Sequence, residues 1–213
     1  MEGRIDVPGV TVKTSGGNVF YADHAVVCAG PWIAQHLIPE LLSHIKPQRI
    51  PVYWFKPKPG RDSLLSHKNM PVFLIETDKG ALLYGLPSGI GPEQSIKIGF
   101  YNRQLLDIYK ATHLEAKPRQ FIDEMSNEVS SCFVDLVPEP IAKKWCTYTM
   151  SSDESFILGK KIGCPSVFYA SAYSGQGFKF APAVGKILTD WVCGRRTSID
   201  TSPFDISRFK THD

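Results

Sequence analysis

Val167-Phe168-Tyr169-Ala170, followed shortly by Ser174-Gly175-Gln176-Gly177-Phe178-Lys179-Phe180, is the stretch of this sequence that says most about its fold. The first run is apolar, which is typical of a buried strand, and the second is a glycine-flanked turn that opens a helix. A strand that enters a helix through such a turn points free backbone N–H groups, and the positive end of the helix dipole, at the group above it. An anion or an electron-rich ring carbonyl fits there, and a flavin that becomes anionic on reduction is one such group.

A second informative stretch, Trp145-Cys146-Thr147-Tyr148-Thr149, lies upstream. Cys146 and Tyr148 are two residues apart, so in a strand both side chains point to one face. A cysteine there can anchor a cofactor covalently, and a tyrosine can wall a substrate pocket. Taken alone, a single cysteine in a strand is usually a small buried hydrophobe, and that alternative stays open at this point.

Three blocks of the sequence resemble the monomeric sarcosine oxidase family of FAD-dependent amine oxidases, which includes peroxisomal sarcosine/pipecolate oxidase and N-methyltryptophan oxidase. The family pattern reads Cys-x-Tyr-Thr, then Asp-Glu-x-Phe-Ile, then Ser-Gly-His-Gly-Phe-Lys. The blocks here are Cys146-Thr147-Tyr148-Thr149, Asp153-Glu154-Ser155-Phe156-Ile157 and Ser174-Gly175-Gln176-Gly177-Phe178-Lys179, with Gln176 in the histidine position as the only departure. The resemblance implies oxidation of a secondary or cyclic amino acid, such as sarcosine or L-pipecolate, to an imine, with O2 reduced to H2O2.

Members of this family resemble other dinucleotide-binding flavoproteins in opening with a strand, a G-x-G-x-x-G turn and a helix. That pattern does not occur in these 213 residues, and the G-x-G runs at Gly89 and Gly175 lie in the wrong context. The resemblance therefore covers about the C-terminal half of a family member. We expect the chain to be part of a longer oxidase, with Met1 the start of a gene model. The alternative is a truncated isoform that acts as a binding module without catalysis.

The sequence predicts an α/β (α+β) fold, with part of a dinucleotide-binding FAD domain and an antiparallel-sheet substrate domain. A Ser-Gly-Gly-Asn turn between alternating segments predicts a hairpin over 10–14 and 19–21. Apolar segments separated by prolines, without helices between them, predict an antiparallel sheet. The other expected elements are strands at 25–30, 49–55, 71–76, 81–85 and 95–101 and helices at 33–37, 118–133 and 178–192. The resemblance assigns residues 1–46 and 141–213 to the FAD domain and 47–140 to the substrate domain.

Lys97 lies in the alternating segment Ile96-Lys97-Ile98-Gly99-Phe100-Tyr101, which places it on the same strand face as Gly99 and Tyr101. An isolated lysine of this kind is usually solvated. In the family that the chain resembles, a lysine here stands over the flavin and assists its reaction with O2. A fixed cation in a dry site stabilises the superoxide that the first electron creates. Tyr101 replaces a histidine of the relatives. Tyr84 matches a tyrosine at the border of their substrate pocket, with ordinary packing as its alternative.

The resemblance implies further roles in catalysis and binding. Lys179 would face the substrate carboxylate, with a solvated first-turn lysine as the alternative, and Tyr148 would wall the substrate pocket and take part in catalysis. Gln176 can still hydrogen-bond in place of the histidine, although its amide does not titrate. Cys146 would form a thioether to the flavin. The expected cofactor contacts are Ala29, Gly30, Trp32, Cys146, Gly175, Gly177, Phe178 and Lys179.

Composition narrows the function classes. Hydrophobic residues make up 43% and charged residues 21% of the chain, as in ordinary globular proteins. The net charge of +3 comes without a long basic stripe, which argues against nucleic-acid binding. The five cysteines lack a C-x-x-C pair and the six histidines lack ligand spacing, so neither a zinc site nor a disulfide framework is expected. No apolar run reaches the ~18 residues that a membrane span needs.

The resemblance implies a small amino acid and O2 as partners and a monomeric protein, and the composition argues against a nucleic acid or a membrane as partner. The relatives imply a peroxisomal location, although Thr211-His212-Asp213 does not match a Ser-Lys-Leu address, and a cytoplasmic location is the alternative. A fructosyl-amino acid (Amadori) oxidase of related fold is a further alternative, which differs in its substrate.

Overall fold

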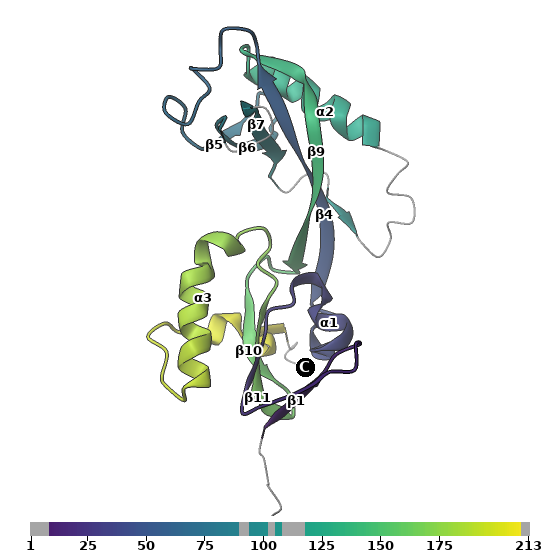
Figure 1. The fold of residues 1–213 in the computed structure, drawn as a ribbon, viewed down its shortest axis with the longest axis vertical. Coiled ribbons are helices and arrows are strands. Elements are labelled where there is room, and N and C mark those ends of the chain that lie inside the picture. The colour runs from purple at the N-terminus through teal and green to yellow at the C-terminus, as the bar shows by residue number, and fades with distance from the viewer. Residues whose placement is uncertain (1–8, 90–93, 102–104, 108–117, 210–213) are drawn as a thin grey trace, which may run out of the picture. The chain divides into compact units, whose positions relative to one another are not determined.

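The computed structural model describes residues 9–89, 94–101, 105–107 and 118–209, and these form two compact units (Figure 1). The first unit comprises Met1–Pro47 and Tyr148–Asp213, and the second comprises Gln48–Thr147. The second unit is thus inserted in sequence between the two parts of the first. Each unit has its own hydrophobic core, so each is described by itself.

The first unit begins with the predicted hairpin. Strands β1 (Val10–Lys13) and β2 (Val19–Ala22) pair antiparallel, with Val10 opposite Ala22 and Lys13 opposite Val19. Thr14 closes the turn, because its backbone N–H donates to the Asn18 carbonyl at 2.9 Å and its hydroxyl oxygen accepts from the Asn18 N–H at 3.2 Å. The hairpin prediction is therefore confirmed.

A three-stranded sheet of order β10-β11-β3 forms the centre of the first unit. β10 (Ile157–Lys161) pairs antiparallel with β11 (Cys164–Ser171), and β11 pairs parallel with β3 (Ala25–Val27). Helix α3 (Gly177–Val192) packs on one face, where Val184, Ile187 and Leu188 meet Leu158, Phe168 and Ala170. The other face packs against three short helices: α1 (Ile33–His36), η2 (Pro39–Leu41) and η7 (Ile206–Phe209). The short helices η1 (Gly30–Trp32) and η6 (Ser202–Phe204) also belong to this unit.

The strand predicted at 25–30 is shorter than expected. β3 ends at Val27, and Val26 is 45% exposed. β3 is partly exposed because it stands at one end of the three-stranded order within the described residues. An apolar run alone does not distinguish an end strand from a central one.

The second unit is an antiparallel sheet with one long helix. The strand order is β5-β6-β7-β4-β8, and β9 also pairs with β4. The bounds are β4 Ile45–Pro57, β5 Phe73–Glu76, β6 Leu82–Leu86, β7 Ile96–Phe100, β8 Leu106–Asp107 and β9 Leu136–Ser151. Helix α2 (Pro118–Cys132) packs on one sheet face, where Met125 and Val129 join Tyr53, Phe55, Ile96, Ile98 and Phe100. The predicted strands and helix are confirmed.

β9 differs from its prediction. The sequence places the end of the substrate domain at Pro140, but β9 runs without interruption from Leu136 to Ser151 and contains Pro138 and Pro140. The break between the units falls at Tyr148 instead. Which unit holds FAD and which holds the substrate stays a prediction. Among the described helices, none is long and apolar enough to cross a bilayer.

Candidate functional site

Two predicted cofactor segments meet at one edge of the sheet in the first unit. β3 and β11 are parallel neighbours, with Val27 opposite Tyr169, so their carboxyl ends lie at the same edge. There, β3 leads into residues 28–32 and β11 into residues 172–176. Ligands of open α/β sheets bind outside the carboxyl ends of the strands. We call residues 29–32 and 172–178 the carboxyl edge.

The turn between β11 and α3 has a strained backbone. Ala172, Ser174 and Gly175 have positive φ values of 57°, 48° and 82°. Glycine adopts this region freely, whereas each non-glycine residue there costs on the order of 1–3 kcal/mol. Such a conformation persists only where the surrounding structure holds it, and strained turns of this kind concentrate at binding sites.

Ser174 holds the strained turn against the end of β9. The Ser174 N–H donates to the Thr149 carbonyl at 3.1 Å, and the buried Ser174 hydroxyl accepts from the Ser151 N–H at 3.3 Å. The same hydroxyl donates to the Ala172 carbonyl at 3.3 Å. With these three bonds, Ser174 fixes the turn.

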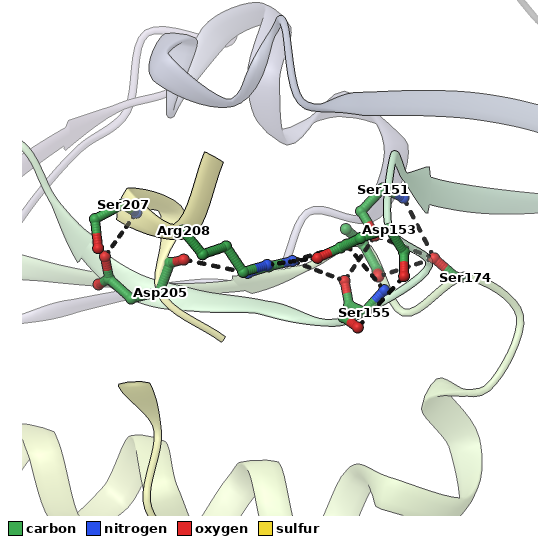
Figure 2. A network of polar contacts seen from close by, with 8 residues as sticks. Ser151, Asp153, Ser155, Ser174, Asp205, Ser207 and Arg208 are labelled. Atoms are coloured by element: carbon green, nitrogen blue, oxygen red, sulfur yellow. Dashed lines mark hydrogen bonds and ion pairs between the residues drawn. The ribbon is translucent and has the colours of Figure 1, made fainter. Parts of the chain in front are cut away.

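Asp153 lies beside this turn in an ion pair with Arg208. The Arg208 Nε and Nη2 atoms donate to the two Asp153 carboxylate oxygens at 2.7 and 3.1 Å (Figure 2). Asp153 and Glu154 lie in a turn after β9, and Glu154 has a φ of 56°. The hydrogen bond from Arg208, aided by the Ser155 N–H and opposed by partial burial, lowers the pKa of Asp153 to about 2.

The Asp153 ion pair predicts an acid-sensitive component of stability. Because the folded pKa is depressed, the pair stabilises the fold above the ordinary aspartate pKa of about 4, and this stabilisation is lost as the pH falls toward about 2. We expect Asp153→Asn to lower the urea midpoint at pH 7 and to remove much of its fall between pH 4 and pH 2. Asp78→Asn, which removes an exposed turn carboxylate, is the control. Equal pH dependence in wild type and Asp153→Asn would contradict the assignment.

Two glycines of the carboxyl edge let aromatic rings approach the backbone. A Cβ atom on Gly175 would lie 2.7 Å from Cε2 of Tyr148, and one on Gly177 would lie 2.7 Å from Cγ of Tyr173. Burial, with a smaller contribution from Cys28, raises the pKa of Tyr173 to about 12, so its phenol is neutral at pH 7. The close packing of these rings explains why the sequence has glycine at both positions.

The start of α3 presents free N–H groups. Gln176 stands at the N-cap position without a side-chain cap among the described residues, and the first N–H groups of a helix lack partners inside the helix. Phe178 is 97% exposed, so this end of the helix is open on that side. Uncapped donors at a turn that is packed by aromatic rings fit the electron-rich pyrimidine edge of a flavin ring. The residues present are therefore compatible with that part of FAD.

The other predicted contact residues on the carboxyl edge are Ala29, Gly30, Trp32 and Lys179, and the side chains of Trp32 and Lys179 are exposed. Gly30 has a φ of 54°, and the Trp32 N–H donates to the Ala29 carbonyl at 3.2 Å. The Trp32 side chain is 66% exposed. Lys179 is exposed, and its Nζ lies 5.5 Å from the ring centroid of Phe180. Their contacts with the cofactor and substrate stay predictions.

Gln176 borders an apolar cavity of ≈ 430 Å³ in the first unit. Phe156, Phe180 and Phe204 line this cavity, and the Phe156 ring centroid lies 5.0 Å from that of Phe180. Glu154 also lines it. The Gln176 side chain therefore borders a largely apolar space.

In the second unit, Lys97 lies on the sheet face opposite α2. Its strand neighbours Ile96 and Ile98 point into the core beneath α2, as the alternation predicts. Trp54 of β4 and Leu86 of β6 stand directly opposite Lys97 on its two sides. Lys97 is half-buried, and no ion pair within the described ranges involves it. An uncompensated lysine beside apolar side chains is the arrangement that the predicted role requires.

Tyr84 lies on the same face as Lys97. It stands opposite Gly99, and a Cβ atom on Gly99 would lie 2.8 Å from both Cζ and Oη of Tyr84. Tyr101 continues the alternation beyond β7, and its N–H donates to the Leu82 carbonyl at 2.9 Å. The structure therefore brings Lys97, Tyr84 and Tyr101 to one face, which we call the Lys97 face.

Cys146 is a half-buried free thiol in β9. Its neighbour Trp145 packs on Phe121 of α2, with ring centroids 6.4 Å apart. Because successive strand residues point to opposite faces, Cys146 points away from α2. The thioether to the flavin stays a prediction.

Sequence reasoning missed two residues with clear positions in these arrangements. Trp54 flanks Lys97, and it could have been found by alternation, since Tyr53 and Phe55 on either side of it enter the core. Arg208 lies in a short 3-10 segment far from every motif, and no periodic pattern or spacing indicated its ion pair with Asp153.

Residues 2–191 match the protein family described as FAD dependent oxidoreductase. The chain is 34% identical over 209 residues to the N-methyl-L-tryptophan oxidase of Salmonella dublin, which covers 96% of this chain and 52% of that protein. It is 30% identical over 201 residues to the monomeric sarcosine oxidase of Streptomyces avermitilis, which covers 94% of this chain and 51% of that protein. A modified fructosyl peptide oxidase from Aspergillus nidulans has a similar fold, with a TM-score of 0.70 at 18% identity over 92% of this chain and 48% of that one.

The chain spans about half the length of the curated relatives it matches. Both relatives come from bacteria, so they give no support to a peroxisomal location, which stays a prediction. The mixed α/β fold expected from the sequence is confirmed, and so is the resemblance to these oxidases. Because the family match extends over most of its length, the chain belongs to the FAD dependent oxidoreductase family, whose members use FAD as cofactor.

Proposed function

We propose that this chain is the part of an FAD-dependent amine oxidase that contacts the flavin ring and the substrate. The observation that carries the proposal is the half-buried Lys97, which has no ion pair within the described ranges and lies between Trp54 and Leu86. A partly buried charge without an ion pair lowers the stability of the fold. Such a cost is typical of functional sites, where the charge is needed. Reduction of O2 needs a fixed cation in a site with little water.

The substrate is a secondary or cyclic amino acid of the sarcosine or L-pipecolate type. FAD, when bound, would supply the two-electron oxidation at the carbon next to the amine nitrogen and the return of those electrons to O2. The amine becomes an imine by losing two electrons and two protons, and O2 gains both to give H2O2. Lys97 stabilises negative charge on the oxygen, and the N–H groups at the start of α3 hold the pyrimidine edge of the ring.

The remaining predicted residues bind the substrate. Lys179 supplies a positive charge for the carboxylate, while Tyr148, Tyr84, Tyr101 and Gln176 form the walls. In this chain Gln176 can donate or accept a hydrogen bond but cannot change its charge with pH. The substrate preference is therefore expected to differ from that of relatives with histidine at this position.

The first test is an absorbance spectrum of the purified chain after incubation with FAD, acid denaturation and desalting. We expect yellow colour to remain with the wild-type protein and to be lost in Cys146→Ala. Cys164→Ala, which removes another half-buried strand thiol, should keep the colour. Colour retained in Cys146→Ala excludes the thioether at this residue. A wild-type chain that loses its colour only on denaturation contradicts the covalent link. A wild-type chain that is colourless before denaturation contradicts flavin binding by this chain and favours a binding module without catalysis.

A substrate panel distinguishes the oxidase alternatives. H2O2 release with sarcosine or L-pipecolate supports the proposed substrate class. Turnover of N-methyl-L-tryptophan, the substrate in the printed name of one relative, would indicate a pocket for a larger side chain. Turnover of a fructosyl-amino acid alone would replace the proposal by an Amadori oxidase.

A further inference from the structure

The hydrogen bonds that hold the turn of the carboxyl edge are part of a network that extends to Arg208. Starting from the turn at residues 172–175, the contacts pass through Ser174 and Ser151 to the Ser155 carbonyl, which accepts from the Ser151 hydroxyl at 2.7 Å. The Arg208 Nη2 atom donates to the same carbonyl at 3.2 Å. Figure 2 shows Arg208 on one side of Asp153 and Ser155, and Ser151 and Ser174 on the other.

Arg208 is itself held by its own segment. Its Nη1 atom donates to the Asp205 carbonyl at 3.2 Å, and its side chain is only 16% exposed. Ile206 and Phe209 pack against the buried cluster around Tyr169, and the Phe209 ring stacks on His44 with centroids 4.7 Å apart. The guanidinium therefore projects from a fixed base. A planar guanidinium with two bonds to one carboxylate fixes both distance and orientation.

We propose that Arg208 is a positioning residue for the flavin ring, acting through Asp153, Ser155, Ser151 and Ser174 on the strained turn before α3. The inference rests on the proposed function in one respect, that the N–H groups after this turn face the flavin. The turn contains two non-glycine residues with positive φ, Ala172 and Ser174, and contacts from outside must hold such a backbone in place. Among these contacts, Arg208 forms the ion pair with Asp153 and also donates a hydrogen bond to the Ser155 carbonyl.

Hydrogen exchange tests the transmission directly, without FAD. The reporters are three backbone N–H groups. That of Ser151 donates to the Ser174 hydroxyl, that of Ser174 to the Thr149 carbonyl and that of Gln176 to the Tyr173 carbonyl. In the whole chain, we expect Arg208→Gln to speed exchange at these amides about tenfold. Arg208→Lys, which keeps the charge but loses the planar fork, should restore part of the protection. Ser174→Ala should reproduce the effect of Arg208→Gln.

Lys186→Gln is the matched control, because it removes a two-bond ion pair with Asp190 in α3 that does not touch the turn. It should lower the thermal midpoint without changing the three reporter amides. If Arg208→Gln speeds exchange only at residues 205–208 and 153–155, the proposal is overturned, whatever the change in stability. If Arg208→Gln unfolds the chain, Asp153→Asn gives the same test with a smaller perturbation.

Measurements with FAD distinguish the coupling of Arg208 to the turn from the binding of the flavin at the start of α3. We expect FAD to slow exchange at Gly177, Phe178 and Lys179 in the wild type, and Arg208→Gln to weaken the affinity for FAD about tenfold. Faster exchange of the turn in Arg208→Gln, without any effect of FAD on the wild type, would support the coupling while contradicting the flavin site. Unchanged FAD affinity together with faster turn exchange would overturn the role of Arg208 in positioning the ring.

Discussion

Replacement of Lys97 by methionine is expected to slow the reaction of the reduced, FAD-loaded protein with O2 by about 100- to 1000-fold, which is typical for removal of one preorganised electrostatic group. The first electron transferred to O2 creates an anion, and in the proposed mechanism Lys97, on the sheet face opposite α2, stabilises it. Reduction of the flavin by the substrate should change far less, because the substrate does not become an anion at that step. Stopped-flow mixing of reduced protein with O2 measures the oxidative half-reaction, and anaerobic mixing of oxidised protein with substrate measures the reductive one.

Two variants make this result specific. Lys97→Arg keeps a positive charge between Trp54 and Leu86 and should retain a large part of the O2 reactivity. Lys143→Met removes another half-buried strand lysine beside a tryptophan, with its Nζ 5.4 Å from the Trp145 ring centroid, on the α2 side of the sheet. That control should react with O2 as fast as wild type. Equal slowing in both methionine variants would point to a general loss of charge rather than to Lys97.

Gly175→Ala is expected to have the second large effect, at the carboxyl edge. The new Cβ atom would lie 2.7 Å from the Tyr148 ring in a residue whose φ is 82°. The positive φ alone costs about 1–2 kcal/mol for a non-glycine residue. The clash must in addition move either the ring or the turn, so we expect a total loss of about 2–4 kcal/mol in the free energy of unfolding and little remaining affinity for FAD.

The chain offers a control that separates these two costs. Gly163 in the β10–β11 turn has a φ of 72°, and a Cβ atom there would meet nothing within 4 Å. Gly163→Ala therefore measures the cost of the positive φ alone. The double variant Gly175→Ala, Tyr148→Ala should recover the part of the loss that comes from the clash. If Gly175→Ala and Gly163→Ala cost the same in urea unfolding, Tyr148 does not pack against the turn as described.

The elements that sequence reasoning predicted well are those whose periodicity comes from one buried face. Val184, Ile187 and Leu188 of α3 repeat at helical spacing because they pack on a sheet, and Ile96 and Ile98 alternate with Lys97 because only one face of β7 is covered by α2. The same alternation placed Lys97 and Tyr101 on one face, and the pairing of β6 with β7 adds Tyr84 to it. Local patterning is thus sufficient where burial is one-sided.

The parts that were missed depend on contacts between distant residues. Pro138 and Pro140 would ordinarily end a strand, but β9 includes both. Arg208 pairs with Asp153, 55 residues earlier, and nothing in the local sequence of either residue encodes the other. The same holds for the parallel pairing of β3 with β11, which brings the two cofactor segments to one edge. Such pairings follow from packing of the whole unit rather than from local preference.

The insertion of the second unit between the two parts of the first has a consequence for synthesis on the ribosome. Residues 48–147 are contiguous, so this unit can begin to fold as soon as they have left the exit tunnel. β3 must wait for β11, because Ala25 pairs with Val167. Pairing at such long range is slow, so β3 gains β11 as its neighbour late. Nascent chains halted after residue 147 has left the tunnel, but before residue 171 has, should therefore show protease resistance in the second unit before any appears in the first.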